Sequence, residues 1–322
     1  MQTEPDRMKA PRGARRTRPR RSPRGAAAAL VVVSVVVGLV LTVATLALIS
    51  RARLARVYAV PLVELPEAAH ALDEGRRLYT LYGCIDCHGA RLEGRVLIEG
   101  GPLGRYVAPN LTRGAGGVAA RIDDDALVAR AVRHGVSPSG RSLRLMPSER
   151  YTHLADGDVA ALVAYLRHAA PVDTSLPRTR VALGGRILHA LGFLELDVAR
   201  GVDHEAPRVD PGEPAATAAY GRYVAGLCTG CHGADLRGGA AAPHDGAGTE
   251  PAVAGNLTPH TDGLAGWRFD ELERAVRRGV GRDGRSLDSG MPSERLELLT
   301  DTELWALWAY LQQLPPLPSA RP

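Results

Sequence analysis

The chain has 322 residues, of which 45% are apolar, and is therefore long enough for two ordinary domains with packed cores. It contains only 2 Phe, 3 Trp and 9 Tyr, so cores of this size would depend on aliphatic side chains unless a cofactor helps to fill them. The net charge of +5 arises from nine basic residues within 1–25 and from Arg51, Arg53 and Arg56; residues 57–322 carry a net charge of −5. Because the bulk of the chain is acidic, a nucleic-acid-binding domain is excluded.

The first predicted element is a membrane-spanning helix. Residues 26–49 form an uninterrupted run of 24 uncharged residues, longer than the apolar core of a cleaved signal peptide and long enough to cross a bilayer. Basic residues are concentrated before the run, which places the N-terminus in the cytoplasm by the positive-inside rule. The sequence thus predicts a basic cytoplasmic tail over 1–25, a single-pass anchor over 26–49 in the cytoplasmic (inner) membrane, and a periplasmic remainder.

The remainder contains an internal repeat. Landmarks of the first copy return in the same order about 144 residues later, which indicates a tandem domain duplication, because two long copies are too few for a solenoid. The paired landmarks are Cys84–His88 with Cys228–His232, Asn110–Thr112 with Asn256–Thr258, Gly140–Leu143 with Gly284–Leu287, and Met146–Arg150 with Met291–Arg295.

Both copies are predicted to be helical. Apolar residues recur at positions i, i+3, i+4 and i+7 near the end of each copy, which places them on one face of a helix. They are Val159, Leu162, Val163 and Leu166 in the first copy and Leu304, Leu307, Trp308 and Leu311 in the second. Thr300 with Glu303 forms a capping box, and Asp124 and Asp270 precede shorter helices that run into Gly135 and Gly279. We therefore predict an all-α fold: a transmembrane helix, a first domain over 67–172, a linker over 173–213 and a second domain over 214–315. The linker stretch from Val181 to Val198 is apolar enough that we expect it to pack on one or both domains.

All four cysteines lie in two Cys-x-x-Cys-His motifs, the attachment pattern of c-type haem. In this pattern Cys84 and Cys87, or Cys228 and Cys231, bind the two vinyl groups, and the adjacent histidine ligates the iron. A thioredoxin-like pair would need a strand–helix unit, a zinc site would need neighbouring pairs, and structural disulfides would need no histidine. The motifs therefore predict two covalently bound haem c groups, with His88 and His232 as axial ligands.

The sixth iron ligand is predicted to be methionine. Beyond the predicted anchor the only methionines are Met146 and Met291, 58 and 59 residues after the motif histidines and in identical Met-Pro-Ser-Glu-Arg strings. A buried core position is the ordinary alternative for a methionine, but it does not explain two equivalent positions. None of the rival histidines recurs in both copies; these are His134, His153, His244 and His260. Iron with both axial positions filled exchanges electrons and leaves no site for a substrate.

With these residues in place, the chain resembles the class I cytochromes c in a dihaem, membrane-anchored arrangement, including the cytochrome subunits of membrane-bound alcohol and sugar dehydrogenases. The second copy carries Asn256-Leu-Thr-Pro259, Gly266-Trp267 and Met291-Pro292, which match loops of that group. The first copy departs from it, since Arg113 replaces the proline and no tryptophan precedes its short helix. The dehydrogenase subunits usually bear three haems, whereas this chain has two motifs.

The resemblance implies a helix near Gly75–Leu81, or Gly221–Leu227, that crosses the C-terminal helix of its own domain. It also suggests haem-propionate partners among side chains that recur in both copies, namely Thr112, Thr258, Arg141 and Arg285. The alternative for the arginines is a solvated loop. The two Asn-Leu-Thr strings match the glycosylation sequon but are interpreted here as loop structure.

The sequence predicts an electron carrier with no catalytic residues. Its expected role is to pass single electrons from a dehydrogenase or quinol oxidase to a terminal acceptor, and its acidic exported part predicts a basic docking face on the partner. The alternative is an obligate electron-transfer subunit of a dehydrogenase or haem–copper oxidase complex. A dihaem peroxidase is less favoured, because a methionine in both copies closes the position that peroxide would need.

Overall fold

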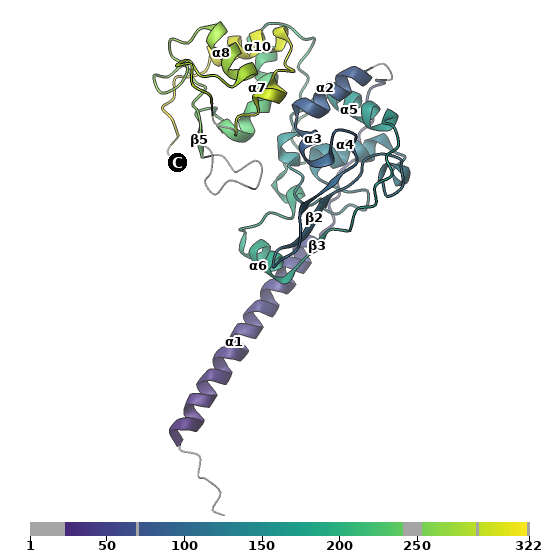
Figure 1. The fold of residues 1–322 in the computed structure, drawn as a ribbon, viewed down its shortest axis with the longest axis vertical. Coiled ribbons are helices and arrows are strands. Elements are labelled where there is room, and N and C mark those ends of the chain that lie inside the picture. Colours follow the sequence, from purple (N-terminus) through teal and green to yellow (C-terminus); the bar gives the residue numbers. More distant parts are fainter. Residues whose placement is uncertain (1–22, 69–70, 241–252, 288–289, 321–322) are drawn as a thin grey trace, which may run out of the picture. The chain divides into compact units, whose positions relative to one another are not determined.

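The structure of the chain is a computed structural model, and it describes residues 23–68, 71–240, 253–287 and 290–320. The fold is mostly helical (Figure 1). The α-helices are α1 (Pro23–Leu54), α2 (Leu72–Leu81), α3 (Cys84–His88), α4 (Asp125–His134), α5 (Asp156–His168), α6 (Leu183–Leu191), α7 (Ala218–His232), α8 (Phe269–Arg278), α9 (Ser293–Leu296) and α10 (Asp301–Leu311). Three short 3₁₀ helices are η1 (Ala119–Arg121), η2 (Ser148–Arg150) and η3 (Val198–Gly201).

Helix α1 contains the predicted anchor. Within its segment Ala27–Leu54 an 18-residue window has a mean hydropathy of 2.8, and the length and composition of the segment suffice to cross a membrane. Most of the predicted basic tail, residues 1–22, lies outside the described residues. Residues 1–46 and 47–322 form separate compact units, and the second unit holds both copies of the repeat.

Each copy is built on a pair of crossed helices. In the first copy α2 packs against α5, and in the second α7 packs against α10. Glycine permits the close approach at both crossings, because a Cβ at Gly75 would lie 2.7 Å from Tyr165 Cβ, and one at Gly221 would lie 2.8 Å from Tyr310 Cβ. Buried aliphatic side chains such as Leu304 complete the cores.

Helix capping follows the sequence with one exception. Asp124 caps α4 by accepting a hydrogen bond from Ala126 N at 2.8 Å, and the capping box of Thr300 and Glu303 begins α10. Helix α8 begins differently from the prediction: Arg268 is its N-cap, and Asp270 lies in its first turn. Gly135 and Gly279 end α4 and α8 in the left-handed conformation that glycine adopts at low cost.

The structure adds short strands to the predicted all-helical fold. β1 (Arg95–Ile98), β2 (Gly104–Ala108) and β3 (Arg180–Val181) form an antiparallel sheet in that order, and β4 (Gly239–Ala240) pairs with β5 (Val253–Ala254). β3 and α6 both belong to the linker, and both contact β2 of the first copy. The apolar linker thus packs on the first copy, where Leu196 and Ala199 are fully buried.

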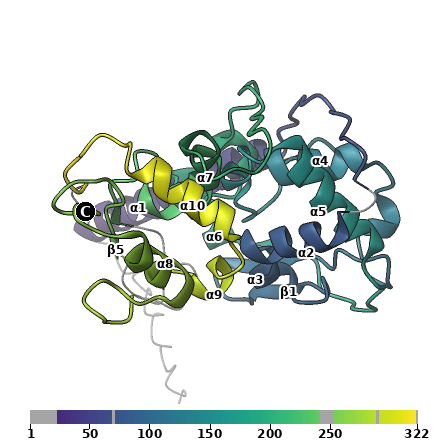
Figure 2. The ribbon, with the colours of Figure 1, turned by 90° about the horizontal axis from the view of Figure 1, so that it is seen from above.

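The two copies meet through equivalent segments. η2 of the first copy contacts α7 of the second, and α9 of the second copy contacts α2 of the first. From above, α9 lies next to the helices α2 and α3 (Figure 2). Arg77 crosses the junction and donates to both carboxylate oxygens of Glu303 at 2.9 Å. Tyr223 also crosses it, donating to Asp158 and accepting from Ala155 N at 3.1 Å. The repeat is therefore packed with approximate two-fold equivalence.

Candidate haem-binding sites

The cysteine motif of each copy lies on a helix that ends at the motif histidine. In the second copy α7 starts at the N-cap Thr217, whose hydroxyl accepts from Tyr220 N at 3.3 Å, and continues to His232. In the first copy a left-handed Gly83 separates α2 from the short helix α3 that carries the motif. Helical spacing places the two cysteines of a motif one turn apart on the same side.

The motif histidines are oriented by backbone carbonyls. Nδ1 of His88 lies 3.0 Å from Pro109 O, and Nδ1 of His232 lies 2.7 Å from Gly255 O. Because a carbonyl oxygen only accepts, Nδ1 carries the proton, and Nε2 is left as the electron-pair donor that a metal would need. Burial lowers the pKa of both histidines, which favours the neutral, ligating form.

The Asn-Leu-Thr loops hold those carbonyls in position. Asn110 follows Pro109, is buried, and donates from Nδ2 to Val172 O at 2.6 Å; its Oδ1 accepts from Thr112 N at 2.8 Å. The second copy repeats the arrangement, with Asn256 donating to Leu317 O at 2.8 Å and accepting from Thr258 N at 2.8 Å. Each loop is thus fixed to the segment that follows the last helix of its own copy. The sequence marked these loops by their recurrence but did not reveal this supporting role.

The methionines follow a repeated backbone scheme. Ser148 N donates to Met146 O at 2.8 Å, and Ser293 N donates to Met291 O at 2.9 Å, which tightens each Met-Pro turn. The serine hydroxyls then donate to the last turns of α4 and α8, to Ala131 O at 3.3 Å and Ala275 O at 3.4 Å. Both methionines are partly buried against the core. The turn thereby has a defined position in both copies.

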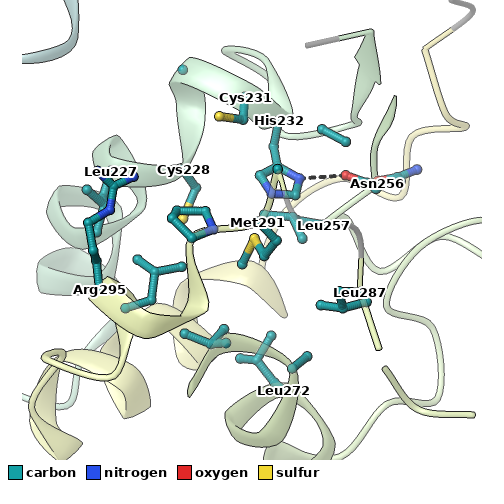
Figure 3. Close-up of a pocket in the computed structure, with 18 of the residues that line it drawn as sticks. Leu227, Cys228, Cys231, His232, Asn256, Leu257, Leu272, Leu287, Met291 and Arg295 are labelled. Atoms are coloured by element: carbon teal, nitrogen blue, oxygen red, sulfur yellow. Dashed lines mark hydrogen bonds between the residues drawn. The ribbon is translucent and has the colours of Figure 1, made fainter. Parts of the chain in front are cut away.

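In the second copy the motif and the methionine line one cavity of about 360 Å³. Figure 3 shows Cys228, His232 and Met291 around the same space, which α7, the Asn256 loop and the Met291 turn enclose. The rest of the lining is mainly apolar: Leu227, Leu257, Leu264, Trp267, Leu272, Val276, Leu287 and Leu296. Two thiols, an imidazole and a thioether in an apolar cavity fit a large flat ring system with a metal at its centre.

The cysteines do not fit the alternative chemistries. Burial raises the pKa of Cys84 and of Cys228 to about 12, so neither thiol would ionise readily as a nucleophile or a thiolate ligand. Among the described residues there is no cluster of three or more His, Cys, Asp or Glu side chains that could hold a metal ion.

The remaining candidates have other partners. Thr112 Oγ1 donates to Asn110 Oδ1 at 2.8 Å, and Thr258 Oγ1 donates to Leu317 O at 3.0 Å, so both hydroxyls serve their own loops. Arg141 and Arg285 are exposed. Among the rival histidines, His134 pairs with His204, with their Nδ1 atoms 3.1 Å apart. The ring of His153 contacts the rings of Tyr82 and Tyr223 at an angle, and His260 lies near Asp262. His244 is outside the described residues.

Sequence comparisons identify the family of the repeat. Residues 70–166 and 214–311 each match the family described as cytochrome c oxidase, cbb3-type, subunit III. The gluconate 2-dehydrogenase cytochrome c subunit of Pantoea cypripedii is 31% identical over 271 residues, covering 72% of this chain and 56% of that protein. A quinone-dependent alcohol dehydrogenase cytochrome c subunit of Komagataeibacter europaeus is 28% identical, covering 81% of this chain and 59% of its own length.

A further relative is closer in length. The diheme cytochrome c-type protein of Cereibacter sphaeroides is 29% identical over 276 residues, which cover 75% of this chain and 85% of that protein. By contrast, the match spans somewhat more than half of the dehydrogenase subunits. Both matched segments include a Cys-x-x-Cys-His motif, and all three of these relatives are named as cytochromes c or their subunits. The chain belongs to the cytochrome c family, an electron-transfer cytochrome with covalently bound haem c.

Proposed function

We propose that this chain is a membrane-anchored dihaem cytochrome that carries single electrons between a membrane or exported dehydrogenase and a terminal acceptor. Two domains, over 67–172 and 214–315, each hold one haem and are joined by the linker over 173–213. The apolar helix over 26–49 anchors the chain, and the basic flanks place the haem domains on the periplasmic side. The observation that carries the proposal is the cavity in which a cysteine motif and a methionine face one another.

Each haem is held by side chains of its own copy. Cys84 and Cys87, or Cys228 and Cys231, would form the thioether bonds, and His88 or His232 would ligate the iron. Met146 or Met291 would supply the other protein ligand. A bound haem supplies reversible one-electron exchange at its iron. The protein orients the imidazole through Pro109 O or Gly255 O, and in the second copy the apolar lining would exclude water from the bound group. With a histidine and a methionine both bound, the iron would have no position left for a substrate.

The haem count and the attachment sites can be tested together. The full chain, expressed with c-type haem maturation, should contain two haems per polypeptide, with the absorption spectrum of thioether-linked haem. Replacing Cys228 and Cys231 by Ser should remove one haem, and replacing Cys84 and Cys87 should remove the other. One haem in the wild type, or two in either double variant, would refute the assignment.

The relatives favour a dehydrogenase as the electron donor, since several are named as cytochrome subunits of dehydrogenases acting on gluconate, alcohol or fructose. The second candidate function is that of an obligate electron-transfer subunit of such a dehydrogenase complex. Purifying the full chain from native membranes in mild detergent distinguishes the two. A stoichiometric catalytic subunit would establish a fixed complex, whereas the chain alone, still reduced by a membrane donor, would establish a free carrier.

A further inference from the structure

The linker helix α6 lies against the end of the anchor helix α1. Arg53, in the last turn of α1, donates from Nη1 to Ala190 O at 3.0 Å and to His189 O at 3.4 Å, which are carbonyls at the end of α6. The last turns of α1, residues 47–54, belong to the same compact unit as α6, and Figure 1 shows the two helix ends side by side. A cation beside the carbonyl end of a helix is stabilising, so this contact fixes the end of α6 beside α1.

Further contacts hold the segment that follows α6 at the same place. Arg144 donates from Nη2 to Leu54 O at 3.1 Å and from Nη1 to Leu196 O at 3.0 Å. Tyr58 donates from its hydroxyl to Asp197 at 2.9 Å. Leu196 and Asp197 are buried, so these bonds join the end of α1 to a packed part of the linker.

Helix α6 presents an apolar stripe to solvent. Leu183, Ile187 and Leu191 recur at i, i+4 and i+8, and Leu183 and Leu191 are each 52% exposed. Gly185 and His189 lie on the opposite side of the helix and are buried. A Cβ at Gly185 would be 2.3 Å from the carbonyl oxygen that precedes β2, so the buried side packs on the first copy. The stripe therefore faces away from that copy.

Phe193 adds to this apolar surface just beyond the helix. The left-handed Gly192 ends α6, and Phe193 N donates to Leu188 O at 2.9 Å, which fixes the backbone of Phe193 beside the last turn. The side chain is 79% exposed, more than any other large apolar side chain that the structure describes. From residue 187 to residue 194 the only titratable side chain is His189, which is buried.

This surface lies at the level where the predicted span ends. Arg53 follows Ile49, the last residue of the span, by one helical turn, a rise of about 6 Å. Helices that lie in a membrane interface bury their apolar face about 5–10 Å into the boundary between headgroups and acyl chains. Arg51 and Arg56 are exposed cations at the same level, and such side chains attract anionic headgroups. Lipid is therefore the partner whose chemistry and position fit the patch.

We propose that Leu183, Leu191 and Phe193 form a second membrane contact, inserted into the periplasmic leaflet beside the anchor. The inference rests on the proposed membrane anchoring by residues 26–49. Because α6 packs on the first copy, the contact would hold that copy against the bilayer instead of letting it turn freely on a tether. A dehydrogenase in the same membrane would then meet the first copy in a restricted orientation.

The test places the photoreactive amino acid p-benzoyl-phenylalanine at position 193, where irradiation inserts its ketone into neighbouring C–H bonds. The haem-loaded full chain is reconstituted in vesicles of phosphatidylcholine with a smaller share of phosphatidylglycerol. The matched control carries the probe at Leu298, which is also exposed and whose carbonyl contacts Arg77 of α2, at the end of the first copy away from α6 (Figure 1). We expect mass spectrometry to find a lipid adduct at position 193 and none at position 298.

Two results in vesicles would overturn the proposal: no lipid adduct at position 193, or equal adducts at the two positions. Native membranes provide a second sample in which a partner is present. The lipid adduct should persist there, whereas a cross-link to another protein in its place would assign the patch to a partner subunit and refute the lipid contact.

Phe193→Ser gives an independent measurement in the same vesicles. If lipid covers the ring, its loss should speed amide hydrogen exchange across α6, and Leu298→Ser should leave that exchange unchanged. Unaltered exchange in Phe193→Ser would contradict the proposal, because a side chain exposed only to water contributes little to stability. Extraction of the chain by alkaline carbonate, or fewer than two covalent haems, refutes the proposed function instead, and both are measured on the same samples.

Discussion

The helix crossing in the second copy provides a quantitative test of the fold. The prediction concerns Gly221→Ala, which adds one methyl group where α7 crosses α10. That methyl carbon would lie 2.8 Å from Tyr310 Cβ and closer still to the carbonyl oxygen of Ala306. Carbon atoms in contact prefer separations of about 3.5–4.0 Å, so the helices would have to move apart by about 1 Å.

The cost of this separation exceeds the gain in helix propensity. Overpacking a close contact typically costs about 1–3 kcal/mol, whereas Gly→Ala within a helix contributes only about 0.5–1 kcal/mol in favour of folding. The obstacle includes backbone atoms, which cannot rotate away, so we expect the overpacking cost to be near the upper end of its range. The net loss in the free energy of unfolding should then be about 2 kcal/mol. The melting temperature should then fall by about 8–16 °C for a domain of about 100 residues.

Gly157→Ala is the matched control. Gly157 lies in α5 with no atom within 4 Å of its Cβ position, so alanine there should leave stability unchanged or raise it. The assay is chemical denaturation of both haem-loaded variants, followed by far-ultraviolet circular dichroism. Equal stability of Gly221→Ala and Gly157→Ala would refute the assignment of Gly221 to a close backbone crossing. Gly75→Ala in the first copy should behave like Gly221→Ala, since a Cβ there would be 2.7 Å from the Ala161 carbonyl carbon.

Three further predictions address ligation, the junction and pH. Met291→Ala should lower the potential of the second haem and let it bind carbon monoxide, which changes the Soret spectrum; no change in either property would show that Met291 is not the ligand. Arg77→Met leaves the buried carboxylate of Glu303 without its cation and should cost about 3 kcal/mol in chemical denaturation, part of which Glu303→Gln should restore in the double variant. Burial lowers the pKa of His153 and of His134 to about 4, so as pH falls from about 6.5 to 4 the unfolded chain binds protons that the native chain does not, and stability decreases. His153→Gln should flatten this decrease by up to about 3 kcal/mol, and an unaltered pH profile would contradict the burial of its ring.

The sequence predicted the features that depend on local pattern. The helices α5 and α10, the capping box at Thr300 and the glycine that ends α4 depend on residues within a few positions of one another, and all three are present. The crossing of helices within each copy, which the family resemblance implied, is also present. The first residue of α8 was predicted less well. Asp270 is a common N-cap type, but Arg268 takes that position because its backbone N donates to Glu271 at 2.8 Å.

Features that depend on pairing between distant segments were not predicted. β1 has the sequence Arg-Val-Leu-Ile, without the alternation that marks a half-buried strand, and its partner β2 is short. The side on which the linker packs depends on the pairing of Gly104 with Val181, which no local pattern indicates. The contact of Arg295 with Asp86 joins residues 209 positions apart, so only the structure could relate the repeated arginine to the opposite motif.

A duplicated electron carrier requires some difference between its copies if electrons are to move in one direction. Two identical haem sites would have equal potentials and no preferred order, whereas a difference of about 59 mV gives a tenfold preference for a one-electron transfer. Asp86 and Arg95 lie beside the first motif, and their counterparts Gly230 and Gly239 carry no charge, so the two halves of this chain are not built alike around their motifs.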